Sequence, residues 1–290
     1  MASEAEAARV FAPAKINLFL HVGGKRADGY HELESLVVFA RAGDGLAFER
    51  ADELSLTIDG PFAGALSPDP DNLVLKAART LAALAGVRKG ARIALTKNLP
   101  VASGIGGGSA DAAAALRGLN VLWQMHLPSE ELRTIAAQIG SDVPVCVESK
   151  PAWMEGRGEK VTALAGIPEA SMVLVNPGVA VSTGKVFAAL KERRGVGGPL
   201  PPTMKSVSGL VAFLRTTAND LEAPARGIAP IIGEVLDALA SQPGVMLARM
   251  SGSGATCFAL FESDAAAHDA AVAIETRHTG WWVQPTVLGT

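Results

Sequence analysis

The chain has 290 residues, which favours two domains at the usual size of about 150 residues each, although one large domain is compatible with that length. Hydrophobic residues make up 49% and charged residues 19%, and this composition excludes a largely disordered chain. The net charge of -3 comes without a basic segment, which argues against a nucleic-acid partner.

The start of the chain, Met1–Glu6, carries acidic residues where a secretion signal would carry Lys or Arg. No uninterrupted apolar run approaches the roughly 18 residues that a membrane span needs. We therefore expect a soluble, cytoplasmic protein.

The first half of the chain alternates short strands with helices. Its predicted elements are strand text from Val10 to Val22, strands at Glu34–Ala40, Gly45–Glu49 and Leu54–Ile58, a helix at Leu73–Leu84 capped by Asn72 and ended by Gly86, a strand at Ala91–Thr96, a helix at Ser109–Gln124, a helix from Ser129 to Gly140, and a short apolar run at Val143–Val147. The Ala-rich face of the Ser109–Gln124 helix can pack close to a sheet.

The second half has the pattern of a ferredoxin-like domain. Its predicted elements are a strand at Met172–Val175, helices at Thr183–Arg193, Lys205–Thr216 and Ile228–Ala240, a surface loop at Gly195–Pro202, strands at Val245–Met250 and Thr256–Phe261, a helix at Asp264–His278 and a strand at Trp281–Leu288. The charged, Gly-rich segment Glu155–Gly158 marks a plausible boundary, which predicts domains at 1–158 and 159–290.

A Gly-rich loop between a strand and a helix is the strongest local signal. It consists of Pro100, Val101, Ala102, Ser103, Gly104, Ile105, Gly106, Gly107, Gly108, Ser109 and Ala110. Glycines let backbone N–H groups approach a phosphate, and the start of a helix adds unpaired N–H groups and a positive dipole end. Ser109 offers a hydroxyl to phosphate or Mg²⁺. A flexible turn with a helix cap is the alternative. The P-loop and dinucleotide-binding patterns both fail, because the required Gly-Lys-Ser/Thr triplet and third glycine are missing.

Ser251–Thr256 contains a second glycine loop between two predicted strands. A hairpin turn explains its two glycines without any ligand. Paired with the first loop, it could close over phosphates or substrate.

Lys15 lies in an apolar segment that is predicted to be a strand, and Asn17, two residues later, points to the same face. Asp142 follows a predicted helix end and precedes an apolar run. A phosphoryl-transfer enzyme needs a group to orient or deprotonate the attacking hydroxyl and a cation to stabilise developing charge. Lys15 and Asp142 could fill these roles, and a solvated lysine and an exposed loop aspartate are the alternatives.

The two cysteines, Cys146 and Cys257, each lie in an apolar run, which favours buried reduced thiols over a disulfide. The five histidines show no metal-ligand spacing with these cysteines, which argues against a zinc site.

Three separated segments together resemble the motifs of the galactokinase, homoserine kinase and mevalonate kinase (GHMP kinase) superfamily. They are Pro13–Leu18, Pro100–Ala113 and Ser251–Ala255, in the superfamily's order and spacing. Within the superfamily, Arg26–Leu33, the triple glycine and Gly140–Pro144 are similar to the diphosphocytidyl-methylerythritol kinases. The likeness covers nearly the whole chain.

The resemblance implies an α+β fold with two domains, an N-terminal one like the second domain of ribosomal protein S5 and a C-terminal ferredoxin-like one, with the active site in the cleft between them. It implies transfer of the γ-phosphoryl group of ATP, with Mg²⁺, to the 2-hydroxyl of the small molecule 4-diphosphocytidyl-2-C-methyl-D-erythritol, a step of the non-mevalonate isoprenoid pathway. The metal ligands and the oligomeric state stay unknown.

The resemblance also implies residue roles. Lys15 and Asp142 would be the catalytic pair, with Asp142 as the base, and the first glycine loop would bind the ATP phosphates. Tyr30 would stack on the cytosine, His31 would bind its polar edge, and Phe187 would be a second stacking residue. Asn17 would line the substrate site. Asn219–Glu222 also resembles a family segment but has no assigned role.

Two alternatives remain open: a related kinase for homoserine or mevalonate, and a sugar-sensing regulator that keeps the fold without activity. Three departures from the family pattern concern nucleotide and base packing. They are Ala110 in place of a second Ser, Ala102-Ser103 in place of glycines, and Val37 in place of an aromatic residue.

Overall fold

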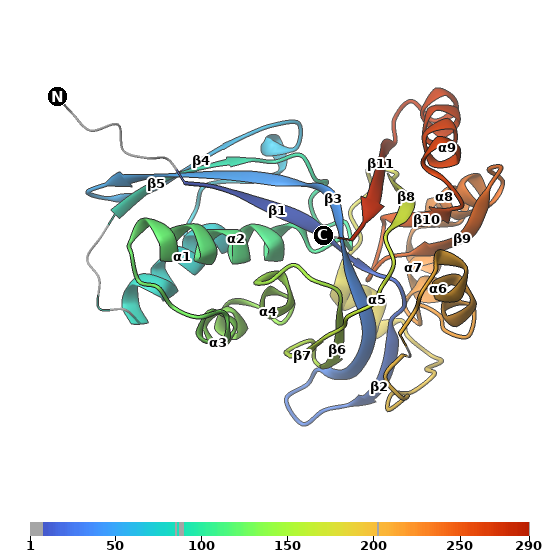
Figure 1. Ribbon diagram of the computed structural model, residues 1–290, viewed down its shortest axis with the longest axis horizontal. Helices are drawn as coiled ribbons and strands as arrows, with labels where there is room; N and C mark the ends of the chain where they lie inside the picture. The colour runs from blue at the N-terminus through green and yellow to red at the C-terminus, as the bar shows by residue number, and fades with distance from the viewer. Residues whose placement is uncertain (1–7, 85, 87–89, 202, 290) are drawn as a thin grey trace. The chain divides into compact units, whose positions relative to one another are not determined.

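The computed structural model describes residues 8–84, 86, 90–201 and 203–289 (Figure 1). The expectations for Met1–Glu6 and for Pro202 lie outside these residues. The chain forms two compact units. Unit 1 holds 1–14, 43–101 and 106–149, and unit 2 holds 15–42, 102–105 and 150–290. Two strands, β1 (Ala8–Asn17) and β3 (His31–Ala51), contribute residues to both units. The expected domain division at residue 158 stays a prediction.

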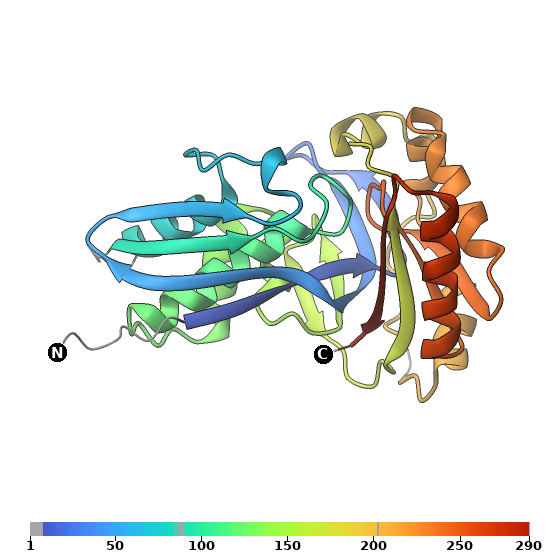
Figure 2. The same cartoon turned by 90° about the horizontal axis from the view of Figure 1, so that it is seen from above.

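Unit 1 is a sheet with helices on one face (Figures 1 and 2). Strand β4 (Leu54–Asp59) is parallel to β5 (Gly90–Thr96), and β5 is antiparallel to β3. Strand β1 also pairs with β3. The remaining elements are the 3-10 turn Ala63–Ala65, α1 (Leu73–Leu84), α2 (Gly107–Leu122), α3 (Ser129–Ile139) and α4 (Val143–Cys146).

The helix α2 of unit 1 can approach its neighbours closely because its side chains are small. Ala112–Ala115 are fully buried, and a Cβ at Gly118 would collide with the ring of Phe48 on β3. The close approach expected from the Ala-rich sequence is therefore confirmed. The cap expected for α1 is also confirmed, because Asn72 Oδ1 accepts a hydrogen bond of 3.0 Å from Val74 N.

Unit 2 contains a four-stranded antiparallel sheet in the order β11–β8–β10–β9. The strands are β8 (Ala170–Asn176), β9 (Val245–Met250), β10 (Cys257–Phe261) and β11 (Trp282–Leu288), with α8 (Ile231–Ala240) before β9 and α9 (Asp264–Arg277) between β10 and β11. Figure 2 shows α9 lying along the sheet. This order, with the first and last strands side by side, is the predicted ferredoxin-like arrangement.

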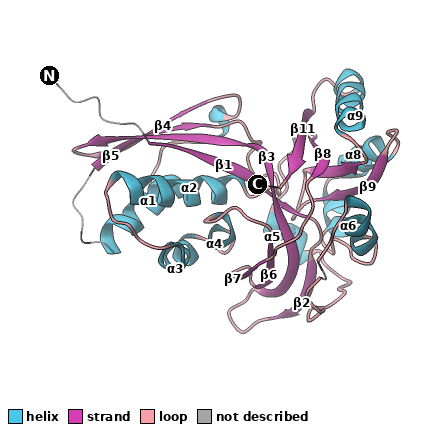
Figure 3. Ribbon diagram, viewed as in Figure 1, coloured by secondary structure: helices cyan, strands magenta, loops and turns pink. Residues whose placement is uncertain are grey.

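The first part of unit 2 is a smaller antiparallel sheet in the order β2–β3–β6–β7. It contains β2 (His21–Lys25), β6 (Ala152–Gly156) and β7 (Lys160–Ala163), and the remaining helices of the unit are α5 (Thr183–Ala188), α6 (Val207–Leu214) and α7 (Glu222–Ile228). Figure 3 shows these strands in magenta beside the cyan helices. No helix in the described part of the chain is long and apolar enough to cross a membrane.

Several predicted elements were wrong in detail. The two strands expected at Glu34–Ala40 and Gly45–Glu49 are one continuous strand, β3. The Gly and Asp between them read as a turn, but Gly43 is needed because a Cβ would collide with Ala12 O. Asp44 is fully buried and accepts hydrogen bonds from two backbone N–H groups. The helix from Thr183 ends at Ala188 instead of Arg193, and α7 was missed.

Candidate functional site

The first glycine loop leads directly into helix α2. Gly106, with φ 61°, caps the helix, and Gly107 and Gly108 form its first turn, so the helix starts two residues before the predicted Ser109. The first intrahelical hydrogen bond is donated by Ala110 N to Gly106 O. The preceding N–H groups of Gly107, Gly108 and Ser109 therefore have no partner in the helix ladder, and unpaired N–H groups at a helix start are able to bind an anion.

One departure from the family pattern falls at a strained position of this loop. Ala102 has φ 52°, in the left-handed region where glycine is favoured. The alanine therefore holds a backbone conformation that glycine adopts more readily.

The second glycine loop is a β9–β10 hairpin turn, and it also touches the first glycine loop within unit 2. Ser251 Oγ donates to Gly104 O at 3.0 Å, and Thr256 N donates to Ser103 O at 3.0 Å. A Cβ at Gly104 would lie 2.5 Å from Ser251 O, so the two backbones approach closely enough to require glycine. The sequence left the pairing of these loops open, and the structure supplies it.

The strand end that carries Lys15 and Asn17 joins the same group of loops. Lys15 N donates to Ile105 O at 2.9 Å, and Asn17 N donates to Ser251 Oγ at 3.1 Å. Lys15 is 3% and Asn17 2% exposed, and the Asn17 side chain donates to Ser35 Oγ. Residues from all three sequence motifs thus meet in unit 2.

Asp142 lies in unit 1, at the start of α4, and it is half-buried. Arg117 fixes the other end of this short helix. Its Nη1 donates to Cys146 O at 2.8 Å and Val147 O at 3.1 Å, and its Nη2 donates to Phe11 O. Burial lowers the pKa of Arg117. Asp142 and Lys15 belong to different units, so their predicted pairing stays a prediction.

A buried charged cluster, which the sequence did not reveal, lies under the first turn of α2. Lys97 Nζ donates to Asp44 Oδ2 at 2.5 Å and to Asp111 Oδ2 at 2.7 Å. A Cβ at Gly107 would lie 3.0 Å from Lys97 Nζ. Burial raises the pKa of Asp111 to about 7, although Lys97 opposes this shift. Among the described residues, Asp111 Oδ1 is a buried oxygen without a hydrogen-bond partner.

The three predicted base-binding residues all belong to unit 2, and two of them are in contact. The rings of His31 and Phe187 are stacked, with centroids 5.4 Å apart and planes 18° apart. Tyr30 is 52% exposed, and the guanidinium of Arg157 lies 5.4 Å from its ring centroid. Burial, Arg193 and Lys25 together lower the pKa of His31, which favours a neutral imidazole. The structure thus offers an accessible aromatic surface and a neutral histidine for a flat heterocycle.

Both cysteines are buried free thiols, as predicted. Burial raises the pKa of the Cys257 thiol well above its ordinary value. Cys257 is therefore an unreactive residue of the β10 core.

The fold and the adjoining motifs define a kinase of the GHMP class. Residues 72–150 match the family described as GHMP kinases N terminal domain, and residues 209–278 match GHMP kinases C terminal. Homoserine kinase from Cytophaga hutchinsonii has the same fold, with a TM-score of 0.72 at 19% identity over 100% of this chain and 96% of that chain.

Relatives with higher sequence identity narrow the assignment to one enzyme family within this class. The chain is 52% identical to 4-diphosphocytidyl-2-C-methyl-D-erythritol kinase from Parvibaculum lavamentivorans, over 96% of this chain and 97% of that protein. It is 55% identical to the enzyme of that name from Cereibacter sphaeroides, over 95% and 97%. A crystal structure of 4-(cytidine 5'-diphospho)-2C-methyl-D-erythritol kinase superposes with a TM-score of 0.78 at 32% identity, covering 98% of this chain and 100% of that chain. The chain belongs to the 4-diphosphocytidyl-2-C-methyl-D-erythritol kinase family, as the sequence motifs indicated.

Proposed function

We propose that this kinase transfers the γ-phosphoryl group of ATP to the 2-hydroxyl of 4-diphosphocytidyl-2-C-methyl-D-erythritol, in the non-mevalonate isoprenoid pathway and in the cytoplasm. The names of relatives that match at 52% and 55% identity over nearly the full chain support the reaction. The observation that carries the substrate assignment is the aromatic group of Tyr30, His31 and Phe187, because a cytosine ring needs stacking surfaces and a hydrogen-bonding edge.

On the nucleotide side, the N–H groups at the start of α2 bind the phosphates of ATP. This assignment is supported by the unpaired N–H groups in the first turn of the helix and by the glycines with left-handed backbone conformation before it. The second glycine loop fixes the first loop through Ser251 and Gly104. A rigid loop presents its donors without reorganisation, which favours electrostatic stabilisation of the transferring group.

For the chemical step, Asp142 accepts the proton of the attacking hydroxyl, and Lys15 stabilises the charge on the transferring phosphoryl group. Asp142 is half-buried and held by a helix whose far end Arg117 ties down. Lys15 is almost fully buried and fixed through its backbone to Ile105. Such fixed groups suit phosphoryl transfer, which depends mainly on positioning and electrostatics.

Mg²⁺ fits the oxygen donors of unit 1. In the described part of the chain, no three or more His, Cys, Asp or Glu side chains gather to hold a metal. Mg²⁺ commonly takes only one or two protein oxygens, the rest coming from phosphates and water. The half-buried Ser109 hydroxyl, in the first turn of α2, would be one such protein oxygen. When bound, the ion would neutralise phosphate charge.

Two other functions are testable against this one. A homoserine or mevalonate kinase would have no use for an exposed aromatic group, because those substrates carry no base. A regulator without activity would not need Lys15 and Asp142. ATP consumption with the cytidyl substrate, homoserine and mevalonate separates all three functions: turnover with the cytidyl substrate alone supports the proposal, and turnover with another substrate or with none contradicts it.

A further inference from the structure

The segment Asn219–Glu222, which resembles a segment of the kinase family, has no role in the proposed chemistry. It follows α6, ends at the first residue of α7, and runs beside Leu20, which lies between β1 and β2. Leu20 N donates to Ala218 O at 3.0 Å, and Asp220 N donates to Leu20 O at 2.9 Å. These two bonds form a parallel bridge between Leu20 and Asn219. The backbone of the segment is therefore fixed, and the side chains of Asn219 and Asp220 reach different neighbours.

Asn219 holds the second glycine loop. Its Nδ2 donates to Met250 O and to Gly252 O, both at 2.8 Å, while its Oδ1 accepts from Leu221 N at 3.0 Å. All of the polar atoms of this buried amide are thus used. A Cβ at Gly252 would lie 2.7 Å from Gly104 O, so the loop that Asn219 fixes is the one that packs on the first glycine loop.

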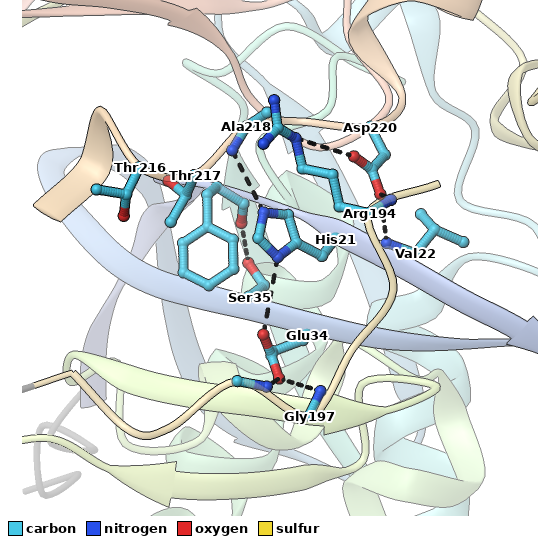
Figure 4. A network of polar contacts seen from close by, with 12 residues as sticks. His21, Val22, Glu34, Ser35, Arg194, Gly197, Thr216, Thr217, Ala218 and Asp220 are labelled. Atoms are coloured by element: carbon cyan, nitrogen blue, oxygen red, sulfur yellow. Dashed lines mark hydrogen bonds and ion pairs between the residues drawn. The ribbon is translucent and has the colours of Figure 1, made fainter. Parts of the chain in front are cut away.

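Asp220 connects β2 with the chain that follows α5 (Figure 4). Its Oδ2 accepts from Val22 N at 2.9 Å and from Arg194 N at 3.0 Å. Val22 lies on β2, the strand that leads to Tyr30 and His31. Arg194 begins a segment, residues 194–198, that follows α5 with its Phe187. We call residues 194–198 the strap.

The strap is attached to the same hairpin at its other end. Gly197 N and Gly198 N donate to Glu34 Oε2 at 2.7 and 2.9 Å, and Glu34 pairs with His21 across β2 and β3. Figure 4 shows Glu34 and Asp220 on either side of His21. A Cβ at Gly23 would lie 2.9 Å from Val196 Cγ2, so the middle of the strap packs directly on β2. The strap therefore ties the chain that carries Phe187 to the hairpin that carries His31.

We propose that Asn219 and Asp220 are positioning residues with separate duties: Asn219 orders the glycine loops for ATP, and Asp220 orders the strap and hairpin for the cytidine group. Neither residue touches a reacting atom in this proposal, which rests on the proposed function. Because the two residues are adjacent, a purely structural role would make their substitutions affect both substrates alike.

The test compares Asp220→Ala with Asn219→Ala in steady-state kinetics. Asp220→Ala removes the acceptor of two N–H groups and should raise KM for the cytidyl substrate about tenfold, with KM for ATP changed less than about twofold. Asn219→Ala should show the reverse, with KM for ATP raised about tenfold and kcat lowered. Asp220→Asn is the matched control, because its amide oxygen can accept both N–H groups and should restore most of the affinity.

Circular dichroism and thermal melting establish that each variant is folded. If Asp220→Ala does not fold, Glu34→Ala releases the other end of the strap and should give the same selective rise in the cytidyl KM. Equal changes in both KM values for the Asn219 and Asp220 variants would overturn the proposal.

Failure of the proposed function gives a different result. A wild-type protein that does not turn over the cytidyl substrate contradicts the function. The ATP dissociation constant still tests the inference in that case: it should rise about tenfold in Asn219→Ala and stay unchanged in Asp220→Ala. Equal ATP dissociation constants in the two variants would overturn it.

Discussion

Lys97 and Asp111 form a buried ion pair, with 2.7 Å between Nζ and Oδ2, directly under the first turn of the helix that begins at the glycine loop. Asp44 completes the group from β3, 2.5 Å from the same ammonium. Burial lowers the pKa of Lys97, but the two carboxylates outweigh it and raise that pKa overall. The lysine is thus charged and joins β3, the end of β5 and α2 at the base of the proposed phosphate site.

Lys97→Met should strongly destabilise the protein. It leaves two buried carboxylates facing each other, and breaking a buried pair in this way costs about 3–5 kcal/mol. Denaturant unfolding measures the loss. Arg92→Met is the control, because its ion pair with Glu49 is exposed on both sides and should be worth about 1 kcal/mol or less. Equal losses in the two variants would contradict a special role for the buried group.

Asp111→Asn should change the pH dependence of stability. An acid whose folded-state pKa is raised, here from 3.8 to about 7, destabilises the folded state above the unfolded value, because the unfolded chain releases the proton more readily. The penalty grows from about pH 4 to about pH 7 and is then constant. Asparagine removes it, so the variant should gain stability relative to wild type across this window. A difference that does not vary between pH 4 and 8 would show that Asp111 titrates normally.

Asp142→Asn should abolish most turnover while ATP still binds. The amide keeps the shape of the side chain but cannot accept the proton of the substrate hydroxyl. Turnover and the ATP dissociation constant are the two measurements. Turnover within a few-fold of wild type would remove Asp142 from the base role.

Lys15→Met should lower kcat by about 100-fold or more, as expected on losing one charge-stabilising group in a preorganised site. Substrate affinity should fall less, because the backbone bond between Lys15 and Ile105 does not depend on the side chain. If KM alone rises, Lys15 is a binding residue without a special role in the transition state.

Tyr30→Ala should raise KM for the cytidyl substrate about 5- to 150-fold, since stacking an aromatic ring on a base contributes about 1–3 kcal/mol. KM for ATP should barely move. Tyr30→Phe keeps the ring and serves as the control, with a KM near that of wild type. Equal effects of Tyr30→Ala on both substrates would make the residue structural.

The fold was predictable where its pattern is local. Both glycine loops, the ferredoxin-like order of the second half and the Ala-rich helix follow from turn residues and periodicity, and each is found within a few residues of its predicted bounds. The long strand β3 was not predicted as one strand, because Gly43 and Asp44 are residue types typical of turns. Their actual causes are a close backbone approach and a buried ion pair, both of which depend on residues far away in the chain.

The candidate site was only partly predictable for the same reason. The roles proposed for Lys15, Tyr30 and His31 come from motifs and stay predictions, but sequence alone gave no reason to connect Asp44 with Lys97, or Asp220 with Arg194. Gly107 shows the limit well. We expected its missing side chain to leave room for phosphate, yet a Cβ there would point at Lys97 Nζ, 3.0 Å away. A side chain at this position would therefore also crowd the buried ion pair beneath the loop.

The division of the chain has a consequence for how it can be cut. The polypeptide passes from one unit to the other at residues 14/15, 42/43, 101/102, 105/106 and 149/150, so no single cleavage releases either unit intact. A fragment that begins at residue 159 would lack β2, β3 and β6. Without β3, Leu288 of β11 would lose its pairing partner, Ala40. A single crossover between two such proteins therefore cannot exchange either unit as a whole.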